Sequence, residues 1–124
     1  MAELKIAIAE DNPLMLELLS SILEAENGFQ VVGTADNGED AYQMIMEKEP
    51  DIVLLDVIMP KLDGITVLEK VREAKGGKNM PSIIMVTAAG NETVASAAFR
   101  NGASYYILKP FDREVLLDKI RLVA

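Results

Sequence analysis

The chain has 124 residues, of which 50% are hydrophobic, and this length suits one domain with a full hydrophobic core. It contains no Cys and no His, which excludes disulfide scaffolds, thiolate or imidazole metal sites, and catalysis by cysteine or histidine. The net charge of −8 disfavours direct binding of nucleic acid or anionic membranes by this chain, and the absence of a long apolar run or secretory signal predicts a cytoplasmic protein without a membrane span.

Short β-branched runs alternate five times with segments of helical periodicity. In chain order, the predicted strands are Leu4 to Ala9, Gln30 to Ala35, Ile52 to Leu55, Ser82 to Val86 and Ser104 to Leu108. The predicted helices are Pro13 to Glu26, Gly38 to Glu49, Gly64 to Ala74, Asn91 to Arg100 and Asp112 to Val123. The run Ile52 to Leu55 is continuously apolar, which is typical of a parallel strand buried on both faces. We therefore predict an α/β fold, a doubly wound five-stranded parallel sheet, over a single domain of residues 1–124.

Local signals support these helices. Pro13 stands at the favoured first position of the first helix, behind Asn12 or Asp11 as the cap. The fourth helix is rich in Ala and has a poor apolar stripe, so we expect it to be weakly packed and able to shift between two positions.

Tyr105 and Tyr106 are neighbours in the fifth strand and must face opposite ways. We expect one of them to lie in the core and the other to be free to turn.

Polar side chains follow four of the five predicted strands. Glu10 and Asp11 follow the first strand, Asp56 the third, Thr87 the fourth and Lys109 the fifth. In a parallel α/β sheet, ligands bind beyond these carboxyl ends. Each residue alone has a structural explanation, such as an acidic group near a helix N-terminus or an ordinary ion pair. Together they favour a functional site.

Three converging carboxylates raise one another's proton affinity, so the site favours a hard cation with oxygen ligands. Because few protein ligands are available, Mg²⁺ that keeps several waters fits best, although another divalent cation is an alternative. One oxygen of Asp56 could then attack a phosphoryl group and form an acyl phosphate. Lys109 and the Thr87 hydroxyl would donate to the transferring oxygens.

These residues resemble the receiver domains of bacterial two-component response regulators. The likeness is carried by Glu10-Asp11, by the segment Leu54-Leu55-Asp56-Val57-Ile58-Met59-Pro60-Lys61-Leu62-Asp63-Gly64, by Thr87-Ala88, by Gly102-Ala103 and by Lys109-Pro110-Phe111. It spans nearly the whole chain. The resemblance implies the flavodoxin-like strand order 2-1-3-4-5 and a cis bond between Lys109 and Pro110.

The resemblance also implies roles for the site residues. Asp56 would accept a phosphoryl group from a phosphohistidine of a sensor histidine kinase or a phosphotransfer protein. Asp11, Asp56 and the backbone carbonyl of Ile58 would bind Mg²⁺, and Glu10 would act through a coordinated water. Because many relatives have Asp where Glu10 stands, direct coordination by Glu10 is less expected than by Asp11.

The same resemblance implies a switch. Lys109 would pair with the phosphoryl group, Thr87 would turn toward it, and Tyr106 would fill the space that Thr87 leaves. The face formed by the fourth helix, fifth strand and fifth helix would then change, with a phosphorylation-dependent homodimer as one outcome. The domain would be a phosphoacceptor signalling domain rather than an enzyme, although one that catalyses its own phosphorylation and dephosphorylation.

A narrower likeness concerns the segments Val31 to Gly38 and Gly102 to Asp112, which resemble the receiver half of the sporulation master regulator of endospore-forming bacteria. This likeness implies an output in sporulation transcription. No effector domain is expected within residues 1–124, so the chain is either a receiver cut from a longer regulator or a free-standing receiver.

Three other functions are alternatives to this one. A phosphohydrolase with an Asp nucleophile, resembling the haloacid-dehalogenase family, needs a second acid two residues after Asp56, where Ile58 stands. A flavodoxin-like mononucleotide binder needs hydroxyl and glycine donors after the first strand, where Glu10 and Asp11 would repel phosphate. A receiver-like interaction module that is never phosphorylated remains the third alternative, and the intact set of site residues disfavours it.

Overall fold

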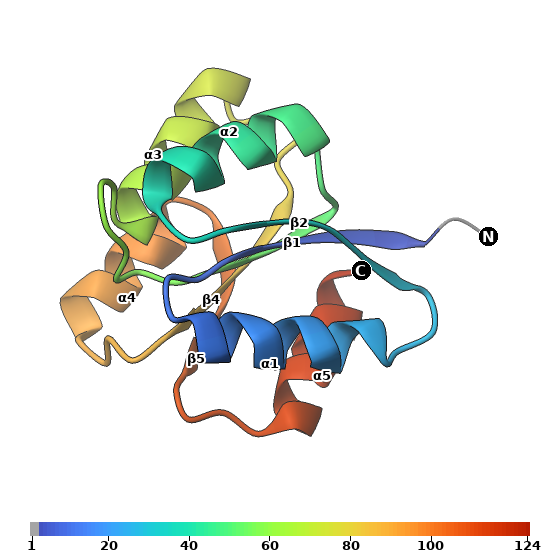
Figure 1. Ribbon diagram of the computed structural model, residues 1–124. Coiled ribbons are helices and arrows are strands. Elements are labelled where there is room, and N and C mark those ends of the chain that lie inside the picture. Colours follow the sequence, from blue (N-terminus) through green and yellow to red (C-terminus); the bar gives the residue numbers. More distant parts are fainter. Residues whose placement is uncertain (1–2) are drawn as a thin grey trace.

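The computed structural model describes residues 3–124, which form ten alternating strands and helices (Figure 1). The strands are β1 (Leu4–Ala9), β2 (Phe29–Ala35), β3 (Ile52–Leu55), β4 (Ser82–Thr87) and β5 (Ala103–Leu108). The helices are α1 (Pro13–Glu24), α2 (Gly38–Lys48), α3 (Gly64–Lys75), α4 (Glu92–Arg100) and α5 (Arg113–Val123). All ten predicted elements are present, and the largest difference in a boundary is at α1, which ends at Glu24 instead of Glu26. Within the described residues, no helix is long and apolar enough to cross a membrane.

The strands form one sheet in the order β2-β1-β3-β4-β5, and every neighbouring pair is parallel. This confirms the predicted fold class and strand order. The chain goes from β1 to β2 on one side and then returns across β1 to β3 on the other, so the winding direction reverses between β1 and β3. In such sheets this reversal opens a crevice at the carboxyl ends of the two strands.

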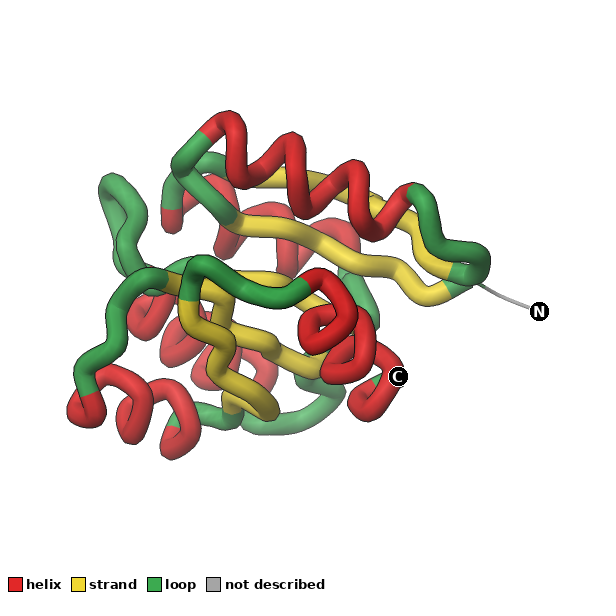
Figure 2. Tube along the Cα trace, turned by 90° about the horizontal axis from the view of Figure 1, so that it is seen from below, coloured by secondary structure: helices red, strands yellow, loops and turns green. Residues whose placement is uncertain are grey.

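Helices cover both faces of the sheet, as the two views show (Figures 1 and 2). On one face, α2, α3 and α4 cover a core that includes Ala7, Val53, Leu55, Ile83 and Met85. On the other face, α1 and α5 cover a core that includes Ile6, Ile8, Ile52, Leu54 and Ile84. Strand β3 alternates between the two cores, and all four of its side chains are buried. Its continuous apolar run is therefore explained by burial on both faces.

Side-chain caps begin the helices at the expected places. Asn12 accepts hydrogen bonds from two N–H groups in the first turn of α1, so Asn12 rather than Asp11 is the cap. Asn37 and Asp112 cap α2 and α5 in the same way. The prediction of weak packing for α4 is confirmed, because Ala98 is the one residue of this helix that is fully buried.

Candidate functional site

The predicted polar residues lie together at the carboxyl edge of the sheet. Backbone hydrogen bonds continue the sheet pattern past the strand ends, with the Asp56 N–H donating to the Ala9 carbonyl at 3.0 Å and the Lys109 N–H donating to the Thr87 carbonyl at 2.9 Å. These bonds hold the first residue after β3 and the first after β5 in line with their neighbours. The tightly paired strands thereby fix the positions from which the functional side chains project.

Lys109 lies between two carboxylates that come from two different strands. Its Nζ donates to Glu10 Oε1 at 2.5 Å and to Asp56 Oδ2 at 2.8 Å. Glu10 is 1% exposed and Asp56 is 4% exposed, so both carboxylates are removed from water. A buried carboxylate is costly unless a cation compensates it, and Lys109 supplies that positive charge.

This burial changes the proton affinities of the group. Burial raises the pKa of Glu10, although the hydrogen bonds from Lys109 and from the Asn12 N–H oppose the rise. Burial by itself lowers the pKa of Lys109, but the hydrogen bonds to Asp56 and Glu10 outweigh it, so the pKa is raised overall. Lys109 is therefore a fixed cation at neutral pH, suited to facing an incoming anionic group.

Glu10, Asp11 and Asp56 form the acidic cluster of the site. One carboxylate oxygen from each lies within 4.8 Å of the other two, so these residues could hold a metal ion. Asp11 is exposed, whereas both oxygens of Glu10 are already engaged, one by Lys109 and the other by the Asn12 N–H at 3.0 Å. The oxygen donors suit a hard divalent cation such as Mg²⁺. The N–H of Ile58 donates to Asp56 Oδ1 at 3.1 Å, which ties the following loop to the same carboxylate.

Thr87 and Tyr106 meet at the backbone of Ala89, at the start of the loop before α4. The buried Thr87 hydroxyl accepts from the Ala89 N–H at 3.2 Å, and the Tyr106 hydroxyl donates to the Ala89 carbonyl at 2.5 Å. Burial, followed by the nearby negative charge of Asp56, raises the pKa of Tyr106. Thr87 on β4 and Tyr106 on the neighbouring strand β5 thus both hydrogen-bond to the loop before α4.

The two tyrosines of β5 do face opposite ways, but neither is fully buried. Tyr105 packs against the core under α1 and α5, and Tyr106 packs against the core under α2, α3 and α4. The expectation that one of them lies in the core is therefore wrong. Each tyrosine has a polar or charged contact near the surface. The Tyr106 hydroxyl donates to the Ala89 carbonyl, and the Lys119 Nζ lies 4.7 Å from the centre of the Tyr105 ring. The bond between Lys109 and Pro110 is cis, as expected.

The sequence analysis missed two glycines that hold the loop after Asp56. A Cβ atom at Gly64 would lie 2.1 Å from the Asp56 carbonyl oxygen, and one at Gly38 would lie 2.0 Å from the Leu62 carbonyl oxygen. The N–H of Gly38 donates to the Pro60 carbonyl at 3.1 Å. The starts of α2 and α3 are thus packed directly on this loop. Each glycine is the first residue of a predicted helix, a position where a side chain is normally tolerated. A glycine at that position in both helices was the signal in the sequence that could have indicated close packing.

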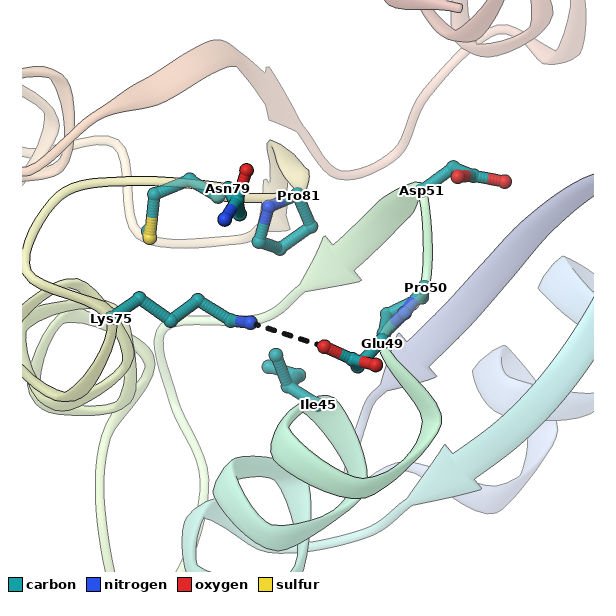
Figure 3. A pocket seen from close by; sticks show the side chains of 8 residues that line it. Ile45, Glu49, Pro50, Asp51, Lys75, Asn79 and Pro81 are labelled. Atoms are coloured by element: carbon teal, nitrogen blue, oxygen red, sulfur yellow. Dashed lines mark ion pairs between the residues drawn. The ribbon is translucent and has the colours of Figure 1, made fainter.

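A hollow at the opposite edge of the sheet is separate from this site. It lies between the end of α2 and the starts of β3 and β4, where Lys75 and Glu49 form an ion pair of 3.9 Å (Figure 3). None of the predicted site residues lines it. The acidic cluster therefore remains the candidate site.

Comparison with known proteins agrees with this geometry. Residues 6–121 match the family described as the response regulator receiver domain. The chain belongs to this family. Receiver domains interact with histidine kinases or phosphotransfer proteins, and they bind Mg²⁺ at the acidic pocket that Glu10, Asp11 and Asp56 form here.

Solved structures of other receiver proteins are similar over nearly the whole chain. The CheX–CheY–BeF3–Mg²⁺ complex from Borrelia burgdorferi contains a chain with 32% identity and a TM-score of 0.90, and the match covers 98% of this chain and 90% of that one. The response regulator domain of Thermotoga maritima CheB has 30% identity and a TM-score of 0.87, with 98% and 96% covered. A putative response regulator from Chloroflexus aurantiacus has 31% identity and a TM-score of 0.86, with 98% and 97% covered.

One expectation from the sequence needs correction. The resemblance led us to expect that the chain catalyses its own phosphorylation and dephosphorylation. The family that it matches is the receiver domain, which is a signalling domain. That catalytic assignment is wrong. The side chains of Ile58 and Ala89, two residues after Asp56 and Thr87, are apolar and offer no group to activate a hydrolytic water.

Proposed function

We propose that this receiver domain accepts a phosphoryl group on Asp56 from a phosphohistidine donor in a Mg²⁺-dependent reaction. The observation that carries the proposal is the buried carboxylate of Asp56 at the end of the central strand β3, with Lys109 Nζ at 2.8 Å and two further carboxylates close by. An isolated buried carboxylate would be costly, and a charge-balanced one facing a cation site is suited to nucleophilic attack.

In the proposed step, a carboxylate oxygen of Asp56 forms a bond to phosphorus while the bond from phosphorus to the donor's imidazole nitrogen breaks. The imidazole leaves with the electron pair of that bond. Lys109, already beside Asp56, would turn to the phosphoryl oxygens as a charge-assisted donor. Thr87, whose hydroxyl lies at the end of the neighbouring strand, would supply a second donor. Bound Mg²⁺ would neutralise negative charge on the phosphoryl oxygens.

We assign the metal ligands as Asp11, Asp56 and the Ile58 backbone carbonyl, with Glu10 acting through a water. This ranking is supported by the hydrogen bonds of Glu10, whose two oxygens accept from Lys109 and Asn12, whereas Asp11 is exposed. Asp11→Ala is expected to weaken Mg²⁺ binding more than Glu10→Ala does, as measured by titration with the metal alone. Equal losses in the two variants would contradict the ranking.

The donor would dock beside the site on α1 and the loop after β5. Leu14 is 78% exposed and Leu18 is 47% exposed on α1. Leu18 also lines an apolar hollow of 380 Å³ with Phe111 and Arg113. Exposed large apolar side chains grouped in this way are typical of protein interaction sites. A sensor kinase or phosphotransfer protein bound here would bring its phosphohistidine close to Asp56.

The output would be a change in the face formed by α4, β5 and α5. Thr87 and Tyr106 both hydrogen-bond to Ala89, so movement of Thr87 toward a phosphoryl group would release the loop before the weakly anchored helix α4. This face would then serve a partner or a phosphorylation-dependent homodimer. The likeness of segments 31–38 and 102–112 to the sporulation master regulator leads us to propose sporulation transcription as the controlled process.

Intact mass after incubation with a small phosphodonor tests the proposal. One added phosphoryl group is expected, and it should require a divalent cation. Asp56→Asn keeps nearly the same shape but removes the nucleophilic oxygen, so the added mass should disappear while the circular dichroism spectrum is retained. Asp51→Asn, at the other edge of the sheet, is the matched control and should be phosphorylated normally. An unchanged mass shift in Asp56→Asn would refute the assignment.

A further inference from the structure

A groove of 530 Å³ lies between α3 and α4, beside the loop that follows Asp56. Its apolar lining residues are Val57, Ile58, Met59, Ile65, Val94 and Ala97. Ile58 is 58% exposed although it is a large apolar side chain. The volume lies within the range of sites that bind ligands or side chains of partners. The groove lies on the α3 side of α4, and none of its lining residues comes from β5 or α5.

The charges around this groove all have one sign. Asp63 and Glu69 line it, no Lys or Arg lines it, and the remaining polar lining is the hydroxyl groups of Thr66 and Thr93. Glu69 is exposed and has no ion pair within residues 3–124. Asp63 is the N-cap of α3, where its carboxylate accepts hydrogen bonds from the Thr66 N–H and hydroxyl, and Glu69 lies in the second turn of the helix. The groove therefore has an apolar floor with two negative positions on its rim.

We propose that this groove binds a basic amphipathic helix of a partner protein. In an α-helix, residues seven apart lie on the same face and are about 10.5 Å apart along the axis. Two basic side chains on that face would lie opposite Asp63 and Glu69, which both line the groove, and apolar side chains between them would contact Ile58 and Val94. A second copy of this chain fits less well, because each copy carries a net charge of −8.

Occupancy of the groove is linked to the state of Asp56, and this part rests on the proposed function. Ile58 contributes its side chain to the groove and its N–H to Asp56 Oδ1 at 3.1 Å. A group bound to Asp56 changes that acceptor and with it the position of Ile58. By thermodynamic linkage, a ligand that senses Ile58 would in turn change the affinity of Asp56 for its modifying group by the same factor.

The test uses a synthetic 14-residue helical peptide with two lysines seven residues apart and two leucines between them on the same face. Binding is followed by chemical shifts of the backbone amides of the full chain. Shifts that cluster on the lining residues support the proposal. Shifts spread over the acidic surface, or centred on Leu18 and Phe111, would overturn it, as would self-association through the groove without peptide. A peptide with glutamates in place of the lysines should not bind.

Two charge reversals on α3 provide matched variants. Glu69→Lys and Glu73→Lys change the net charge equally, and both residues are exposed, but Glu73 does not line this groove. Glu69→Lys should weaken binding of the peptide about fivefold to tenfold, which is the effect expected when one exposed charge contact is reversed in sign. Glu73→Lys should change the binding affinity less than about twofold. Equal weakening would mean that attraction is non-specific and would refute the site.

Beryllium fluoride with Mg²⁺, as a mimic of the phosphoryl group, tests the linkage. The peptide's affinity should differ at least about threefold between the modified and unmodified protein. An unchanged affinity, with Asp56 visibly modified, would refute the linkage alone. Failure of Asp56 to be modified while the peptide still binds in the groove would refute the proposed function but not the groove.

Discussion

Tyr106 shows how one side chain can join strand β5 both to the loop before α4 and to α4 itself. Its hydroxyl donates to the Ala89 carbonyl, while its ring lies 6.3 Å from the ring of Phe99 in α4. The N–H of Ala89 in the same loop donates to the hydroxyl of Thr87 on β4. A substitution of Thr87 or Tyr106 would therefore remove a hydrogen bond to the loop before α4.

The raised pKa of Tyr106 gives a testable pH dependence. Burial and the charge of Asp56 favour the protonated hydroxyl in the folded protein. The unfolded chain then loses its proton first, so this group leaves stability unchanged at neutral pH and lowers it as the pH rises through about 10 toward the folded value. In an absorbance titration of the folded protein, Tyr106→Phe should remove a step that lies above the ordinary tyrosine range. Tyr105→Phe, the control, should leave that step in place, and loss of it there would contradict the assignment.

Packing between elements restricts the loop after Asp56 at the points where the two helices meet it. The N-terminal ends of α2 and α3 both meet it, and they do so at glycines. A Cβ at Gly38 would lie 2.0 Å from the Leu62 carbonyl oxygen, far inside the contact distance. Backbone atoms cannot move aside as a flexible side chain can, so this contact leaves no room for a larger residue.

Gly38→Ala is therefore expected to lower the free energy of unfolding by about 1–3 kcal/mol, as overpacking typically does. Gly90→Ala is the matched control, because the nearest atoms to its added Cβ are side-chain carbons of Leu108 at 3.8 Å, an ordinary contact. The control should change stability by less than about 0.5 kcal/mol. Urea unfolding monitored by circular dichroism measures both. A neutral Gly38→Ala would show that the loop can shift freely, and would weaken the view that α2 helps to position Asp56.

At the scale of the whole molecule, the sheet separates two cores. Ile45 on α2 belongs to the core on one face, and Ile120 on α5 belongs to the core on the other. Both side chains are fully buried. Because the sheet lies between them, shortening one side chain should leave the packing of the other unchanged.

Ile45→Val and Ile120→Val should each cost about 0.5–1.5 kcal/mol of unfolding free energy, through the lost methyl group and the small cavity that remains. The double variant should cost the sum within about 0.5 kcal/mol. Equilibrium urea unfolding of the four proteins measures this cycle. An interaction energy of more than about 1 kcal/mol would show that the sheet transmits repacking from one face to the other.

The sequence by itself determined the order and type of all ten elements, because hydrophobic periodicity and the caps Asn12, Asn37 and Asp112 are local signals. It also indicated which polar residues share an edge, since parallel strands bring their carboxyl ends together. Strand order was available only through the family resemblance.

Other features depended on tertiary structure. Glu10 is buried beside Lys109, and Tyr106 on β5 meets the backbone of Ala89 after β4, so these contacts join different strands. The exposure of Asp11 likewise follows from the surrounding fold and not from the residues next to it. The same holds for the packing of Gly38 on Leu62 and for the acidic groove between α3 and α4. Local pattern specifies which face of an element is apolar, but the distance between two elements is decided by how all their side chains pack at once.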